Sequence, residues 1–288
     1  MKFKRFFYGL MVCLIVATSA SYGNDNIVVT LGNELNQQQR QQMLKLFNVE
    51  EGSTKILVVT NQEERQYLEG VATEKQLGSR AISSAYVESL GKGSGITAET
   101  YNITWVTEEM IMNALVTAGV SDAKVIAASP FEVSGTAALT GILKAFEEVT
   151  GDVISEEQKK VANEEMITTG ELGEDIGKDS ASTLVREVKE IIVEKKIKEP
   201  EEIKKIILEI AGKLDISLNQ KQIEDLSRLM EQITKLNLNT DAIKQKLEGI
   251  GQQIKDISKD NEQVKSLLTR ILDAIKRLIE YISSMLSK

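Results

Sequence analysis

The chain has 288 residues, of which 42% are hydrophobic and 27% charged, and it contains one cysteine and no histidine. This length and apolar fraction allow one or two domains with a real core and argue against disorder over the whole length. The absence of histidine excludes Ser-His-Asp and Cys-His catalysis, as well as zinc sites with histidine ligands. Without histidine, carboxylates, lysines, tyrosines and hydroxyl groups remain for any chemistry. We expect no metal and no cofactor.

Residues 1–23 have the pattern of a secretory signal peptide. Three basic residues lie within 1–5, residues 6–17 are almost wholly apolar, and small polar residues follow. The apolar run is shorter than the roughly 20 residues that a membrane-spanning helix needs. We therefore expect cleavage after Ala20 or Gly23 and a secreted, extracellular protein, with cell-surface association as a further option.

Charge divides the remaining chain into two parts. Residues 24–180 carry 12 basic and 25 acidic side chains, whereas residues 181–288 carry 20 basic and 18 acidic ones. An acidic front half argues against nucleic acid as a partner, because phosphates need compensating Lys and Arg. The partner itself stays unknown. The different charge and periodicity of the two parts predict two modules.

The front part, 24–170, alternates between strand and helix patterns, which predicts an α/β or α+β module with a mixed sheet. The expected strands are 27–31, 55–60, 81–90, 96–106 and 123–128, and the expected helices are 36–47, 63–68, 107–118, 135–149 and 155–167. The glycine-rich segment 91–95 lacks the spacing of a phosphate-binding loop and precedes a strand, so we interpret it as a hairpin loop. Residues 171–181, acidic and glycine-rich, are interpreted as a linker.

Two places in this module are candidate binding sites. Trp105 ends an expected strand and could stack on a ligand, although a lone tryptophan more often belongs to a core. Ser134, Gly135 and Thr136 begin an expected helix, where free backbone amides can bind an anion, although an ordinary N-cap explains the same residues.

Carboxylates near the strands are candidates for an acid–base pair. They are Glu88, Glu99, Glu108 and Glu109. The spacing holds no two of them at a catalytic distance, so we assign no catalytic residue and keep Glu88 and Glu108 as binding candidates only.

Six segments in one order resemble the YpuA-like secreted family, a domain-of-unknown-function family. They are 28–32, 82–88, 93–96, 102–107, 113–120 and 134–141, within roughly 27–170. The resemblance implies a secreted protein of Gram-positive, often spore-forming bacteria. It implies no known activity, so no catalytic residue is carried over.

Residues 182–288 are predicted to form an all-α helical bundle or a coiled-coil tail. Helices are expected over 182–198, from Pro200 at a first turn, and after the cap Asn219. Apolar residues then alternate at spacings of four and three, with one polar member, Asn261, at a position where a buried Asn can fix register. This stripe is Ile243, Leu247, Ile250, Ile254, Ile257, Asn261, Val264, Leu268, Ile271, Ile275, Leu278, Ile282 and Met285.

Three arrangements of this tail remain open. It can fold back on 203–236 as an intramolecular bundle, or self-associate as a coiled coil. It can also lie on anionic lipid, since residues 265–288 carry five basic and two acidic side chains. We expect a bacterial surface or extracellular protein with a non-enzymatic binding or structural role and a helical association tail. The alternatives are an extracellular hydrolase with paired carboxylates and a protein that binds a membrane surface through its C-terminal helix.

Overall fold

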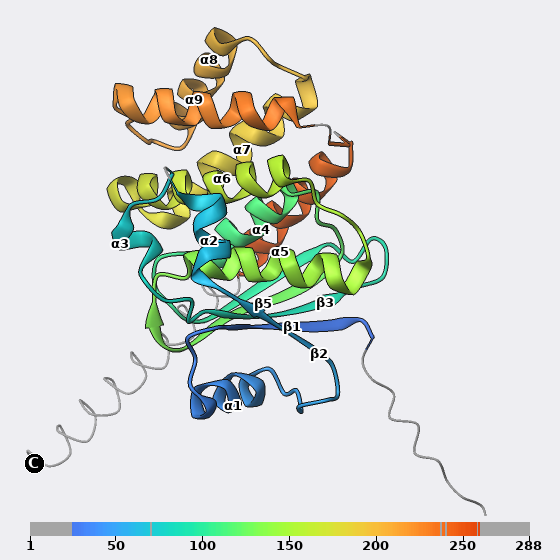
Figure 1. Cartoon of the computed structure of the whole chain (residues 1–288). Helices are drawn as coiled ribbons and strands as arrows, with labels where there is room; N and C mark the ends of the chain where they lie inside the picture. The colour runs from blue at the N-terminus through green and yellow to red at the C-terminus, as the bar shows by residue number, and fades with distance from the viewer. Residues whose placement is uncertain (1–24, 70, 237, 240, 258, 260–288) are drawn as a thin grey trace, which may run out of the picture.

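The computed structural model of the protein describes residues 25–69, 71–236, 238–239, 241–257 and 259. Its N-terminal half holds a five-stranded mixed sheet and its C-terminal half is mostly helical (Figure 1). The strands are β1 Ile27–Gly32, β2 Lys55–Val59, β3 Ser84–Ser89, β4 Ile96–Ile103 and β5 Ala123–Val133. The helices are α1 Gln37–Leu46, α2 Asn61–Leu68, α3 Glu74–Leu77, α4 Glu108–Thr117, α5 Thr136–Thr150, α6 Glu156–Ile176, α7 Lys178–Lys195, α8 Pro200–Lys213 and α9 Gln220–Lys235, followed by a helix over 241–257.

The sheet has the strand order β2-β1-β3-β5-β4. The outer pairs β1–β2 and β4–β5 are parallel, and the inner pairs β1–β3 and β3–β5 are antiparallel. Because β5 lies between β3 and β4, the expected hairpin at 91–95 is wrong. That segment instead connects two strands that do not pair.

The loop at 91–95 is held by a carboxylate of the chain itself. The backbone N–H groups of Gly93 and Gly95 each donate to Asp122 Oδ1 at 2.9 Å. Both glycines have positive φ, which L side chains rarely adopt. The Asp122 carboxylate thus occupies backbone N–H groups that a phosphate-binding loop would leave free for its ligand.

Strand β5 runs five residues beyond its expected end at Ala128 and contains Pro130. Pairing with β3 stops at Ala128, so residues 129–133 face only β4, where the register shifts between Tyr101 and Ile103. A proline is tolerated at such a one-sided, irregular stretch because its missing N–H breaks no ladder there. For this reason the strand predicted from the sequence ends at Ala128, five residues too early.

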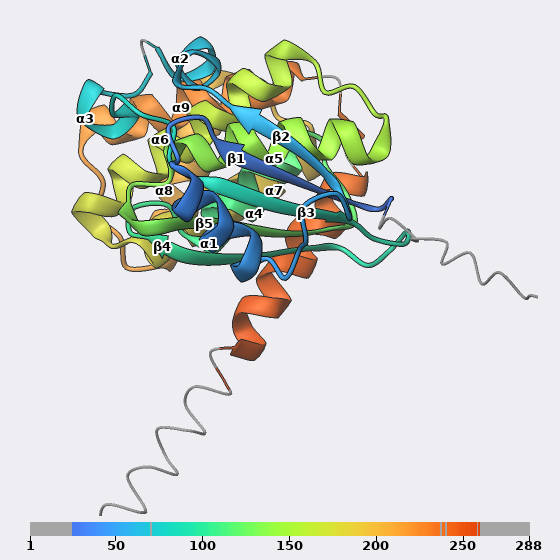
Figure 2. The ribbon, with the colours of Figure 1, turned by 60° about the horizontal axis from the view of Figure 1, so that its bottom comes forward.

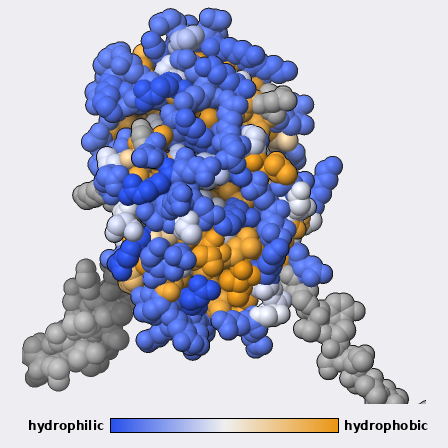
Figure 3. Space-filling model, viewed as in Figure 1, coloured by the Kyte–Doolittle hydropathy of each residue, from blue (hydrophilic) through white to orange (hydrophobic). Residues whose placement is uncertain are grey.

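The two faces of the sheet are covered differently. Val29 and Leu31 of β1 pack against Met43 and Leu44 of α1, whereas Val28, on the alternate face, belongs to the cluster that includes α4 and α5. Figure 2 shows α1 alone over the first face and the other helices beyond the second. Figure 3 shows apolar surface over the edge of the sheet where β2 runs, and Val58 of β2 is exposed there.

One large hydrophobic cluster extends from the sheet into the C-terminal helices. It includes Val28 of β1, Leu115 of α4, Leu184 of α7 and Ile250 of the last described helix. The division into modules at 170 and 182 stays a prediction, and this cluster contains residues from both sides of it. Within the described part of the chain, no helix combines the length and apolarity needed to cross a membrane.

The segment expected as a linker, 171–181, is helical instead. Helix α6 runs to Ile176, and α7 begins two residues later. Its glycines permit close packing: a Cβ on Gly173 would lie 3.1 Å from the Cα of Lys178, and one on nearby Gly170 would lie 2.3 Å from the Trp105 ring. Glycine enrichment therefore reflects lack of space here, not flexibility.

The first part of the predicted stripe packs against its own chain. Ile243, Leu247 and Ile250 are buried, Ile254 is half-buried, and the side chain of Ile257 is 59% exposed. The rest of the predicted stripe lies outside the described residues: Asn261, Val264, Leu268, Ile271, Ile275, Leu278, Ile282 and Met285. A coiled coil thus stays a prediction.

Candidate functional site

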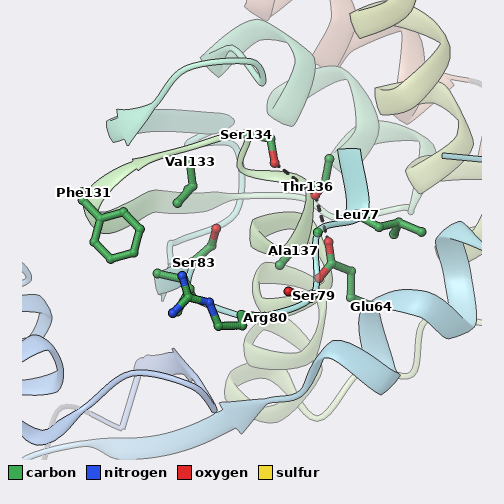
Figure 4. A pocket seen from close by; sticks show the side chains of 12 residues that line it. Glu64, Leu77, Ser79, Arg80, Ser83, Phe131, Val133, Ser134, Thr136 and Ala137 are labelled. Atoms are coloured by element: carbon green, nitrogen blue, oxygen red, sulfur yellow. Dashed lines mark hydrogen bonds between the residues drawn. The ribbon is translucent and has the colours of Figure 1, made fainter. Parts of the chain in front are cut away.

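A cavity of about 210 Å³ lies where β5 ends and α5 begins. Its walls come from the loop 77–83, the end of β5, the first turn of α5 and one side chain of α2 (Figure 4). The lining residues used below are Glu64, Ser79, Arg80, Ser83, Phe131, Ser134 and Thr136. Two of the candidates named from the sequence, Ser134 and Thr136, line this cavity, and Gly135 joins them.

Gly135 makes the sharp turn into α5. Its φ of +95° is left-handed, and a Cβ there would lie 2.3 Å from Cγ2 of Ile103, so glycine is required twice over. As the N-cap of α5 it has no side chain to bond the first turn. The first backbone N–H groups of α5, and with them the positive end of the helix dipole, therefore lie at the cavity.

Glu64 is fully buried at the inner end of the cavity. Its carboxyl group accepts hydrogen bonds from Thr136 Oγ1 at 2.8 Å and from Asn61 Nδ2 at 3.2 Å. Burial raises the pKa of Glu64 from 4.5 to about 7, against the lowering effect of these two bonds. Near neutral pH this carboxyl group can both accept and donate a proton.

Arg80 and Phe131 are exposed residues of the cavity. Figure 4 shows Phe131 at one end and Glu64 with Thr136 at the other, with Arg80 and Ser83 between them. Among the residues that the structure describes, Arg80 has no ion pair or hydrogen bond to a side chain. The cavity thus combines a cation, an aromatic ring and hydroxyl groups around one buried acid.

Trp105 has a packing role. Its indole Nε1 donates to Glu174 Oε1 at 2.9 Å, and its ring lies against Gly170, so it joins the end of β4 to α6. It is half-buried beside the hydrophobic cluster. The structure does not bring it to the cavity at α5.

The carboxylates named from the sequence lie in two separate places. Glu88 accepts from Tyr86 at 3.0 Å, and Glu99 pairs with Lys124 at 3.1 Å. By strand register, both lie on the sheet face that carries α1. They are held by neighbouring strand residues.

Glu108 and Glu109 lie at the start of α4, beside a second cavity of about 670 Å³. Glu108 is exposed and accepts from the Thr100 N–H at 3.1 Å. Glu109 pairs with Arg186 at 3.3 Å, and burial raises its pKa to about 7 in spite of this cation. Within the described residues, no group of three or more acidic or cysteine side chains could hold a metal ion.

Sequence reasoning missed Glu64, Arg80 and Phe131. For Glu64 there was a signal: it stands four residues before Leu68 on one face of α2, and Leu68 is fully buried. Arg80 and Phe131 come from a loop and a strand end, where no periodic pattern shows which side chains meet.

Comparisons with known proteins give one family. The family model described as "Protein of unknown function (DUF1002)" matches residues 31–250. The "Uncharacterized protein YpuA" of Bacillus subtilis (strain 168) is 37% identical over 265 residues, which cover 92% of this chain and 90% of that protein. No solved structure matches the chain. The resemblance seen in the sequence is therefore confirmed, and the chain belongs to the YpuA-like family of unknown function, DUF1002.

Proposed function

We propose that the protein is an exported bacterial binding protein. Its cavity at the N-terminus of α5 would bind a small ligand that carries one anionic group and several hydroxyl groups, such as a sugar acid. The observation that carries this proposal is the meeting, in one cavity, of Arg80, the N-terminal turn of α5 and the buried acid Glu64. Export rests on the signal-peptide pattern of residues 1–23.

The anionic group is argued from Arg80. A guanidinium has five N–H donors in a plane that matches a carboxylate, and this one has no acidic partner among the described residues. The N-terminal amides of α5 favour negative charge at the same cavity. Both effects act in the same direction and favour a negatively charged group of a ligand at this cavity.

Residues at the other end of the cavity favour hydroxyl groups on the ligand. Glu64 and Thr136 accept and donate hydrogen bonds there, and Ser134 lies beside them. Phe131 offers an apolar surface on which the C–H face of a sugar ring can pack. A volume of about 210 Å³ limits the ligand to about the size of a monosaccharide.

A binding role is favoured over hydrolysis by the arrangement of the carboxylates. A glycoside hydrolase needs two carboxyl groups about 5 to 9.5 Å apart across the bond that is cleaved. Glu88 is bonded to Tyr86 of its own strand, Glu99 to Lys124 of the neighbouring strand β5, and Glu109 to Arg186 of α7. These partners give the carboxylates structural tasks.

The test is titration calorimetry of the mature chain with gluconate and glucuronate, and with glucose as the neutral control. We expect heat only from the acids, and at least about tenfold weaker binding in Arg80→Gln, because a charge-assisted hydrogen bond contributes about 1.5–3 kcal/mol. Lys92→Gln, an exposed cation of the loop at 91–95, is the matched control. Equal affinity for glucose and gluconate, or an unchanged Arg80→Gln variant, would contradict the proposal.

A further inference from the structure

The second cavity, of about 670 Å³, forms a groove at the end of the last described helix. It is bounded by the starts of α4 and α7, the segment 214–216 and the end of the helix over 241–257. Its apolar lining includes Met112, Leu214, Ile216, Ile254 and Ile257. We call it the acidic groove because of the side chains at its rim.

The rim of the acidic groove is negatively charged. Glu108 and Asp179 are exposed there. The single lysine of the lining, Lys178, donates its ammonium group to the carbonyl oxygen of Thr104. An apolar floor with an acidic rim fits a basic amphipathic helix.

The stripe of the last helix leaves the protein core at this groove. Leu247 and Ile250 are almost completely buried, whereas Ile257, ten residues after Leu247 on the same stripe, is 59% exposed. An isoleucine that is in phase with a buried stripe and still exposed is an incomplete contact. The groove lies beside it.

The sequence that follows has the matching chemistry. The four-three spacing of apolar residues continues from Ile257 to Met285, and residues 265–288 carry five basic and two acidic side chains. The spacing predicts that the helix continues, and each further residue then adds about 1.5 Å to the distance from the groove. A chain with an unbroken helix therefore cannot fill its own groove.

We propose that the acidic groove binds the C-terminal segment, 265–288, of a second copy of this chain. A reciprocal exchange of the two segments closes the assembly as a two-fold symmetric dimer. The apolar side of the segment covers Ile257 and the floor of the groove, and its basic side chains face Glu108 and Asp179. This interface is independent of the cavity at α5.

The first experiment measures the solution mass of the mature chain by light scattering after size exclusion. We expect a dimer for the wild type and a monomer for Ile257→Asp. Leu208→Asp is the matched control, since Leu208 of α8 is 52% exposed and both substitutions add a charge at an exposed apolar residue. A monomeric wild type, or an Ile257→Asp variant that stays dimeric, would overturn the proposal.

A charge exchange then separates groove binding from pairing between two tails. Glu108→Lys with Asp179→Lys changes the groove, and Arg270→Glu with Arg277→Glu changes the segment. We expect each double variant to be monomeric and an equimolar mixture of the two to be dimeric, since each hetero-pair joins opposite charges. A circular dichroism spectrum like that of the wild type shows that each variant is folded.

Two outcomes of this exchange count against the groove. If the groove variant dimerises like the wild type while the segment variant does not, the tails pair with each other and the groove is not the site. If the mixture stays monomeric although both variants are folded, the charges do not meet. Gluconate binding in Ile257→Asp should equal that of the wild type, so failure here is distinguishable from failure of the proposed function.

Discussion

Two fully buried glutamates show how differently the same side chain is used in this protein. Glu165 of α6 lies in the interior between α4 and α7, where Lys189 donates to its Oε1 at 2.6 Å and Thr117 donates to its Oε2. Glu64 of α2 is equally buried, but its partners are a hydroxyl group and an amide. Glu165 forms an ion pair with Lys189, whereas Glu64 forms no ion pair with any side chain that the structure describes.

This difference in partners indicates that Glu165 has a structural role. Lys189 also donates to the Asn113 carbonyl at 2.8 Å and to Thr117 at 3.0 Å, so all of its ammonium protons are used. The two charged groups of this interior therefore satisfy each other. Glu64, in contrast, lies beside a cavity and is buried without an ion pair among the described residues, and this burial raises its pKa.

Removing the lysine should produce the largest effect. Lys189→Met leaves Glu165 buried without a counter-charge, which costs about 3–5 kcal/mol of unfolding free energy. Denaturant unfolding at pH 7 measures it. The control is Lys221→Met, which breaks the ion pair with Asp225. The Lys221 side chain is 80% exposed, so we expect a much smaller loss there. Similar losses in the two variants would mean that the buried ion pair of Glu165 stabilises the protein no more than the exposed ion pair of Asp225.

Changing Glu64 should act through pH. Since its pKa is about 7 when folded and 4.5 when unfolded, the folded state binds more protons between these values, and stability falls as the pH rises through them. Glu64→Gln removes that slope. Relative to the wild type, the variant should gain up to about 3 kcal/mol between pH 4.5 and 8.5, as measured by denaturant unfolding at both values. Parallel curves for the two proteins would contradict the raised pKa.

Two threonines one turn apart on α5 give the smallest and most local test. Thr136 donates to Glu64, whereas the buried hydroxyl of Thr140 has no hydrogen-bond partner in the part of the chain that the structure describes. Thr136→Val should cost about 1 kcal/mol and raise the pKa of Glu64 further, whereas Thr140→Val should cost nothing or stabilise the protein. Thermal unfolding of both variants at pH 8.5 decides it, and equal losses would count against the bond to Glu64.

Much of the fold could be predicted because local patterns carry it. Thr107 and Ser155 begin helices expected from the sequence, and Asn219 is an expected cap; the side chain of each accepts a hydrogen bond from a backbone N–H of the following turn. The strand order could not be predicted, because pairing of β5 with both β3 and β4 is a contact between distant segments. The prediction of a linker over 171–181 was wrong because glycine is selected by close contacts as well as by flexible joints.

The candidate site was predictable only in part. Ser134, Gly135 and Thr136 form a local turn into a helix, and the sequence indicates such turns directly. Glu64 and Arg80 reach the same cavity from other elements, at sequence distances that no short motif spans. Spacing along the chain shows which residues share a helix face, but not which faces meet.

The position of β5 has a consequence for how the chain becomes a folded protein. It is the last of the described strands in chain order, yet it lies between β3 and β4 and pairs with both of them. A polypeptide that ends before residue 123 leaves β4 without a partner strand and β3 paired on one edge only, with β1, and such open edges can pair with other chains. The sheet is therefore closed late, by non-local contacts that slow folding. If the chain is exported unfolded, its first 120 residues need protection from self-association until the central strand arrives.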